Sequence, residues 1–144
     1  MNQINSGTII NLQISTQKGD PVSRVPELEF IKGLGISGES HAGKSENRQV
    51  LLMDSETQKL FDITPDITRE NVTTKNLQLS KLSPGDMLAL GNSVRLEVTG
   101  DCEPCKSLDI KKPGLSEAIK GHRGILAKVI DSGFVKLNDT IGME

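Results

Sequence analysis

Residues 94–106 have the sequence VRLEVTGDCEPCK, an alternating strand pattern followed by a loop that holds both cysteines of the chain. From residue 94 to residue 98, apolar side chains occupy the even positions and charged side chains the odd ones, which is the period of a half-buried β-strand. Gly100 frees the backbone at the turn that follows, and Pro104 fixes the approach to Cys105. The stretch therefore predicts a strand that carries two thiols at its end.

The Cys-x-x-Cys spacing of these thiols leaves four interpretations open. Cys102 and Cys105 bind a metal, exchange electrons, present one reactive sulfur, or are two ordinary free cysteines. A zinc site usually needs a second pair of ligands, and the two histidines, His41 and His122, are far from the cysteines and lack a His-x(3–5)-His spacing. A thiol-disulfide protein usually places its cysteine pair at a helix start, whereas residues 106–113 are expected to form a loop.

Composition excludes several classes of function. The 144 residues are a typical length for one domain, so residues 1–144 are expected to form a single domain. A net charge of −2 gives no general attraction to nucleic acid or to an anionic membrane, and 2% aromatic residues disfavour a single-strand-binding groove. No apolar run approaches the roughly 20 residues of a membrane span, and the N-terminus lacks a signal-peptide pattern. We therefore expect a cytoplasmic protein with reduced cysteines and no nucleic-acid or membrane partner.

Short strand patterns separated by glycine-rich turns run along most of the chain. Strands are expected over residues 8–15, 22–31, 48–53, 87–90, 93–99, 125–130 and 134–137, with a last pair at 140–141. Short helices are expected over residues 56–60, capped by Asp54 or Ser55, and within residues 114–120. Closing such a sheet removes its exposed edges, so we predict a mostly β fold, a closed or partly open β-barrel with a few short helices.

Some local predictions are specific enough to test against a structure. The first strand is expected to place Ile10, Leu12 and Ile14 on one face. A two-residue turn is expected at residues 91–92, an interruption of regular secondary structure at residues 64–66 and an extended segment over residues 77–82.

The polar segment at residues 68–74 has two interpretations. A polar segment of this kind usually forms an exposed loop. Alternatively, Arg69 and Asn71 offer a guanidinium fork, which suits phosphate or carboxylate, and an amide that donates and accepts.

The glycine-rich stretch at residues 32–44 contains a further candidate, His41. It is either a solvated loop histidine or a hydrogen-bonding group at the rim of a pocket. Residues 38–45 match the letters of the P-loop pattern, but a P-loop follows a buried strand and opens a helix, so we treat this match as accidental. The sequence GHRG at residues 121–124, which includes Arg123, is a second basic and flexible candidate.

Seven motifs in order resemble the MOSC domain, the C-terminal domain of molybdenum-cofactor sulfurases. They are GISGESHAG at 35–43, RQV at 48–50, RENV at 69–72, Leu82 with Gly85-Asp86, LEVT at 96–99, Pro104-Cys105 and GILAKV at 124–129. The resemblance covers residues 8–141 and is closest to the small stand-alone bacterial members.

The resemblance implies a β-barrel like that of pyruvate kinase, with a pocket for a pterin-based molybdenum cofactor (molybdopterin) or a sulfur-carrier role. By motif position, Cys105 would ligate molybdenum or supply sulfur, and Arg69 would hold the anionic end of the cofactor with Asn71 nearby. Arg48 belongs to another of the matching motifs and joins the cofactor-binding candidates. Partners would be proteins of molybdenum-cofactor biosynthesis or a molybdoenzyme, and any sulfur-transfer or molybdenum-dependent activity is expected only with such a partner.

The sequence departs from the family pattern at three positions. Glu39 replaces the usual aspartate, Asn138 replaces a glycine, and Cys102 adds a second thiol that leaves a dithiol or metal role open, with zinc as the alternative to the molybdenum cofactor.

Because a cysteine thiolate at neutral pH needs positive charge nearby, we also hypothesise which cationic groups approach Cys105. Arg69 and Arg123, with His41 or His122, are expected to converge on Cys105 and to hold the cofactor.

Overall fold

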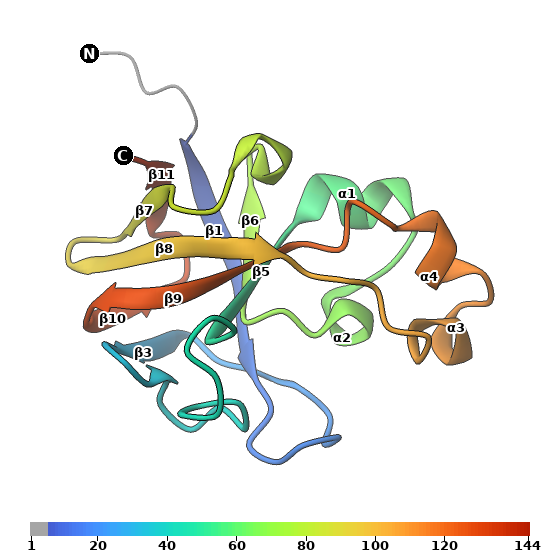
Figure 1. Cartoon of the computed structure of the whole chain (residues 1–144), viewed down its shortest axis with the longest axis horizontal. Helices are drawn as coiled ribbons and strands as arrows, with labels where there is room; N and C mark the ends of the chain where they lie inside the picture. Colours follow the sequence, from blue (N-terminus) through green and yellow to red (C-terminus); the bar gives the residue numbers. More distant parts are fainter. Residues whose placement is uncertain (1–5) are drawn as a thin grey trace.

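The structure is a computed structural model that describes residues 6–144, and its main body is a closed β-barrel (Figure 1). Seven strands close the barrel in the order β1, β11, β7, β8, β9, β5, β6 and back to β1, and every pair is antiparallel except β5 with β6. The strands are β1 (Ser6–Ile14), β5 (Val50–Asp54), β6 (Val72–Lys75), β7 (Met87–Leu90), β8 (Val94–Asp101), β9 (Ile125–Asp131) and β11 (Thr140–Met143). The predicted mostly β barrel is confirmed.

Four further strands extend this body. The strand β2 (Ser23–Arg24) pairs with the end of β1. A separate three-stranded sheet has the order β10 (Gly133–Lys136), β3 (Glu27–Ile31), β4 (Gly35–Ile36). This small sheet contributes fully buried side chains, Phe30 among them, to the core of the barrel.

The first strand differs from its prediction because it contains a bulge. The pairing of β1 with β6 shifts register between Ile9 and Asn11, and a bulge leaves one extra residue unpaired. Ile9 and Leu12 are consequently fully buried, whereas Ile10 is 37% exposed. The prediction that Ile10 shares the buried face with Leu12 is therefore wrong.

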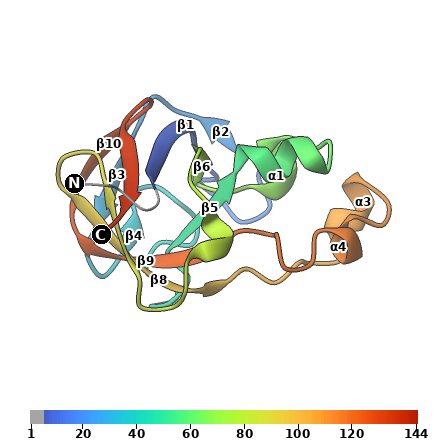
Figure 2. The same cartoon turned by 90° about the horizontal axis from the view of Figure 1, so that it is seen from above.

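The short helices lie together at one side of the barrel, while β10 and the C-terminal end of the chain lie at the opposite side (Figures 1 and 2). They are α1 (Ser55–Leu60), α2 (Pro65–Thr68), α3 (Leu108–Lys111) and α4 (Leu115–Ala118), with a 3₁₀ turn at Leu79–Lys81. A second, smaller core of Met53, Ile63, Leu108, Leu115 and Ile119 lies among them. No helix in the described part of the chain is long and apolar enough to cross a membrane.

The helix ends follow local chemistry. The Asp54 carboxylate accepts a hydrogen bond from the backbone N–H of Thr57 at 3.0 Å, so the predicted cap of α1 is confirmed. The expected break at residues 64–66 is wrong, because Pro65 occupies the first position of α2, where a missing N–H costs nothing. The loop expected over residues 106–113 likewise contains α3.

Three other local predictions are corrected. Residues 77–82 contain the 3₁₀ turn and are not extended throughout. The β7–β8 connection has three residues, because Leu90 pairs with Val94. The strand was expected to end at residue 99, with a turn at Gly100. Strand β8 instead continues through Gly100 to Asp101 with a register shift, so the cysteine loop begins at Cys102.

The glycine-rich stretch forms turns and bends up to β5 and opens no helix, which is not the context of a P-loop.

Candidate functional site

A cavity of about 230 Å³ opens where the cysteine loop meets the glycine-rich turns and the segment that follows α2. It is lined by residues from six parts of the chain, which the barrel and its loops bring together. All seven residues proposed for the site line this cavity: Cys102, Cys105, Arg48, Arg69, Asn71, His41 and Arg123. The structure therefore brings all seven candidates together in one place.

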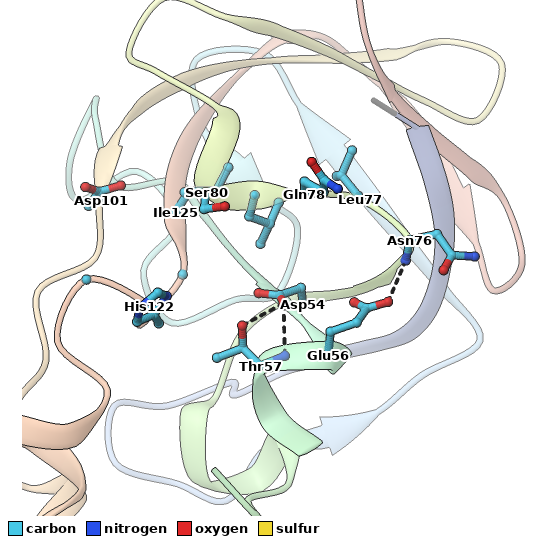
Figure 3. A pocket seen from close by; sticks show the side chains of 13 residues that line it. Asp54, Glu56, Thr57, Asn76, Leu77, Gln78, Ser80, Asp101, His122 and Ile125 are labelled. Carbon is cyan, nitrogen blue, oxygen red and sulfur yellow. Dashed lines mark hydrogen bonds between the residues drawn. The ribbon is translucent and has the colours of Figure 1, made fainter. Parts of the chain in front are cut away.

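His122 does not belong to this group. Figure 3 shows it in a second cavity, of about 390 Å³, together with Asp101 and Asp54. His122 and Asp101 line one cavity, whereas the residues that follow them in the chain, Arg123 and Cys102, line the other. Of the two histidines offered by the sequence, only His41 lines the cysteine cavity.

Two acidic residues of the second cavity, Asp54 and Glu56, are hydrogen-bonded to the protein itself. Asp54 caps α1, and the Glu56 carboxylate accepts a hydrogen bond from the backbone N–H of Asn76 at 2.9 Å (Figure 3). These carboxylates hold the start of α1 and the end of β6 in place.

Arg123 is the most unusual charge in the cysteine cavity. It is only 9% exposed, and its Nη2 donates to the backbone carbonyl of Thr68 at 2.6 Å. Its Nε and Nη1 atoms are buried and have no hydrogen-bond partner. An unsatisfied buried donor costs about 1–3 kcal/mol, and more when it is charged, so an anionic ligand group would relieve a real cost here.

Arg69 and Asn71 are held by specific backbone geometry. Arg69 ends α2 in the left-handed conformation, with φ of 59°, and its Nη2 donates to the carbonyl of Asp20 at 2.6 Å. The Asn71 side chain accepts from the N–H of Leu51 at 3.1 Å and donates to the carbonyl of Gln13 at 3.3 Å. Asn71 therefore ties β1 to β5 and shapes the cavity.

The segment around these residues is buried, which contradicts the exposed-loop interpretation. Glu70 is fully buried, and its carboxylate accepts hydrogen bonds from the hydroxyls of Thr68 and Thr73 and from the amide of Gln58. Burial raises the pKa of the Glu70 carboxyl, although these hydrogen bonds oppose the shift. The network fixes the backbone that carries Arg69 and that binds Arg123.

Cys105 is exposed at the mouth of the cavity, whereas Cys102 is 8% exposed. The hydroxyl of Ser107 donates to Cys105 Sγ at 3.2 Å. Hydrogen bonds from the Ser107 side chain and backbone, and then the positive charge of Arg123, lower the pKa of the Cys105 thiol. Arg123 is one of the cationic groups that the sequence analysis expected near Cys105, whereas the larger contribution, from Ser107, was not foreseen.

Glu39 was absent from the proposed site residues, yet it lines the cavity and is only 8% exposed. Its Oε1 accepts from the N–H of Ser15 at 3.1 Å and from Asn71 Nδ2 at 3.4 Å. Its Oε2 is buried and has no hydrogen-bond partner, and the Nδ1 atom of the exposed His41 lies 3.5 Å from it. The signal that could have found Glu39 is a carboxylate placed among four glycines, two residues before His41. Ser107 was missed too, and its signal is a hydroxyl two residues after Cys105.

The zinc alternative required Cys102, Cys105, His41 and His122 to meet. The structure separates His122 from the other three. Among residues 6–144, no three His, Cys, Asp or Glu side chains are grouped closely enough to hold a metal ion. The geometry thus does not favour a zinc centre built by the protein alone.

Comparison with solved structures finds the same fold in other proteins. The YuaD protein from Bacillus subtilis aligns with a TM-score of 0.80 and 21% sequence identity, over 96% of this chain and 95% of that one. YiiM from Geobacillus stearothermophilus aligns with a TM-score of 0.76 and 16% identity, over 96% and 75%. YiiM from Escherichia coli aligns with a TM-score of 0.70 and 20% identity, over 95% and 69%. Identities this low show a shared fold and nothing finer.

Sequence comparison identifies the family. No curated protein matches the sequence. A family model of the MOSC domain matches residues 40–142, which is most of the chain and includes the end of the first motif and all six of the others that gave the resemblance. The chain belongs to the MOSC domain family.

Proposed function

We propose that the cysteine cavity binds the anionic end of a pterin-based molybdenum cofactor, and that Cys105 ligates molybdenum or carries sulfur to it. The MOSC domain is a family linked to molybdenum-cofactor binding and sulfur transfer. The proposal rests on the residues that line the cavity beside Cys105. Its thiol, with a lowered pKa, shares a cavity with the guanidinium groups of Arg48, Arg69 and Arg123.

The residues present fit such a group. The unpartnered Nε and Nη1 of Arg123 are donors for a phosphate, and a guanidinium binds phosphate in a fork. Pockets for drug-sized ligands have volumes of about 300–1,000 Å³. The cavity, at about 230 Å³, is smaller, so we expect it to hold the anionic end while the rest lies over the exposed His41 and Arg48.

The thiol also suits the metal of this cofactor. A thiolate is a soft ligand, and one cysteine is enough for a cofactor that brings its own metal. When bound, the cofactor would supply a redox-active molybdenum centre that accepts a sulfur ligand. Arg69, Arg123 and Arg48 would bind and orient its charged end, Asn71 would keep the wall in shape, and the Ser107 hydrogen bond would favour the thiolate form of Cys105.

The partners follow from the same proposal. A protein that binds this cofactor or transfers sulfur to it would exchange the cofactor with proteins of cofactor biosynthesis or with a molybdoenzyme. We propose that sulfur transfer or molybdenum-dependent turnover requires such a partner.

Binding of isolated molybdenum cofactor to the apo protein tests the proposal. Wild type, Cys105→Ala and Cys102→Ala are titrated in parallel, and bound molybdenum and zinc are measured by mass spectrometry. We expect saturable molybdenum binding that Cys105→Ala loses and Cys102→Ala retains. Absence of molybdenum binding, with zinc present in wild type and lost from both variants, would replace the proposal with the zinc alternative.

A further inference from the structure

Two buried charges of opposite sign face the cysteine cavity without pairing to each other. Glu39 Oε2 is an acceptor with no hydrogen-bond partner, and Arg123 Nε and Nη1 are donors with none. Both residues are at least nine-tenths buried, at 8% and 9% exposure. The Nδ1 atom of His41 lies 3.5 Å from Glu39 Oε2, on a side chain that is 68% exposed. Buried polar groups are normally satisfied, so this pair is an exception that needs a cause.

The protein holds these two groups in place through one short segment. Arg123 donates to the carbonyl of Thr68, and Glu39 accepts from the side chain of Asn71, three residues further along. The buried Glu70 network fixes that segment from behind. The unpartnered atoms are therefore preorganised, and Cys105 lies close enough to Arg123 for that charge to act on its thiol.

We propose that the cavity binds a small zwitterion, an α-amino acid, between these two charges. The ammonium group of the amino acid donates to Glu39 Oε2, and its carboxylate accepts from Arg123 Nε and Nη1. A cavity of about 230 Å³ suits a ligand of this size. The side chain of the amino acid then faces the thiolate of Cys105.

The proposed sulfur-carrier role of Cys105, on which this inference rests, names the amino acid as cysteine persulfide. The thiolate of Cys105 attacks the outer sulfur of the persulfide, and a new S–S bond forms to that sulfur, which keeps its proton. The S–S bond of the donor breaks, and its electron pair stays on the donor cysteine, which leaves as a thiolate and takes a proton from water. The sulfur keeps its oxidation level, so no external oxidant or reductant takes part. Because Arg123 is also proposed to hold the cofactor, donor and cofactor bind in turn.

Calorimetry with unreactive analogues tests the binding step on the full chain. S-methyl-L-cysteine carries both charges, N-acetyl-S-methyl-L-cysteine lacks the ammonium, and 2-(methylthio)ethylamine lacks the carboxylate. We expect either truncated compound to bind at least about tenfold more weakly than S-methyl-L-cysteine, the effect of one lost charged contact. Equal binding of the N-acetyl compound would overturn the inference.

The variant Glu39→Gln keeps the shape of the side chain and removes its charge. It should weaken S-methyl-L-cysteine by a similar factor and leave the N-acetyl compound unchanged. Glu117→Gln, an exposed change on α4, is the matched control and should bind like wild type. A thermal melt of each variant shows whether it is folded. If a folded Glu39→Gln binds all three compounds like wild type, the zwitterion inference is wrong.

Sulfur loading separates this inference from the proposed function. The mass gain of one sulfur atom on Cys105 is followed with cysteine persulfide and with N-acetylcysteine persulfide. Faster loading by the first donor, with the difference lost in Glu39→Gln, supports the zwitterion site. Equal loading by both donors overturns that site but keeps Cys105 as a sulfur carrier. If neither donor loads sulfur onto Cys105 and the protein does not bind molybdenum, the proposed function itself is overturned.

Discussion

At the scale of the residue, the thiol of Cys105 is tuned by the groups around it. A hydrogen bond from Ser107 and the charge of Arg123 favour its ionised form. Cysteine has an ordinary pKa of about 8.5, so a thiol below that value has more thiolate at neutral pH. The residue is therefore expected to be a better nucleophile and metal ligand than a free cysteine.

Replacing Ser107 with alanine should slow the alkylation of Cys105. The change removes the largest cause of the lowered pKa, so the pKa rises and less thiolate exists at pH 7. We expect a rate about two- to tenfold lower with iodoacetamide, and a pH profile displaced upward. Ser132→Ala, in the turn between β9 and β10, is the control and should react like wild type. An unchanged profile in Ser107→Ala would show that Ser107 does not tune the thiol.

Glu70 gives a second prediction, on stability and pH. Its folded-state pKa is raised above the ordinary value of 4.5, so the folded chain binds a proton more strongly than the unfolded chain. The contribution is therefore fully present below pH 4.5 and is lost as the pH rises through the folded-state pKa. In urea denaturation from about pH 4.5 to pH 8, wild type should lose more stability than Glu70→Gln does. The same slope in both proteins would contradict the assignment, and Glu117→Gln should keep the wild-type slope.

At the scale of the element, the sequence predicted periodicity well and irregularity poorly. The alternating pattern of residues 94–98 correctly indicated β8. The bulge in β1 and the four-residue helices α2 and α3 were missed, because no period is visible over so few residues. The sequence left two interpretations of the polar segment at residues 68–74 open, because its burial depends on the tertiary network around Glu70, which has no local sequence signal.

The bulge predicts that alanine substitution of two adjacent isoleucines destabilises the protein to very different extents. Ile9→Ala deletes a fully buried side chain and should lower the free energy of unfolding by about 2–5 kcal/mol. Ile10→Ala changes a side chain that is 37% exposed and should cost less than about 1 kcal/mol. Urea denaturation of the two variants measures this difference. A larger loss at Ile10 would mean that β1 has the unbulged register.

The entry to β9 depends on Gly124. Its φ is 114°, and a Cβ added there would lie 2.4 Å from the carbonyl oxygen of Leu52. Gly124→Ala should therefore destabilise the protein by about 1–3 kcal/mol and displace the neighbouring Arg123. Gly100→Ala is the matched control, because nothing lies within 4 Å of its added Cβ and its φ is not positive. Similar melting temperatures for the two variants would contradict the proposed close approach.

At the scale of the whole molecule, the barrel gathers residues that are far apart in the chain. The family model matches residues 40–142, yet Ser15, Val22 and Glu39 also line the cavity. Five of the seven candidates that share the cavity came from the motifs, because those motifs follow the strand ends and loops that meet there; Cys102 came from the Cys-x-x-Cys spacing and Arg123 from the basic stretch at residues 121–124. The same motifs did not indicate which charges are buried or unpartnered, since burial of Glu39 and Arg123 is a property of the closed fold.

X-ray absorption at the molybdenum edge tests whether Cys105 ligates the metal. Wild type and Cys105→Ser are loaded with the cofactor, and the sulfur ligands of molybdenum are compared between them, with Cys102→Ser as the control. The account predicts that molybdenum in wild type has one more sulfur ligand than in Cys105→Ser, and that Cys102→Ser matches wild type. Identical sulfur coordination in all three proteins would contradict the claim that Cys105 is the sulfur that meets the metal.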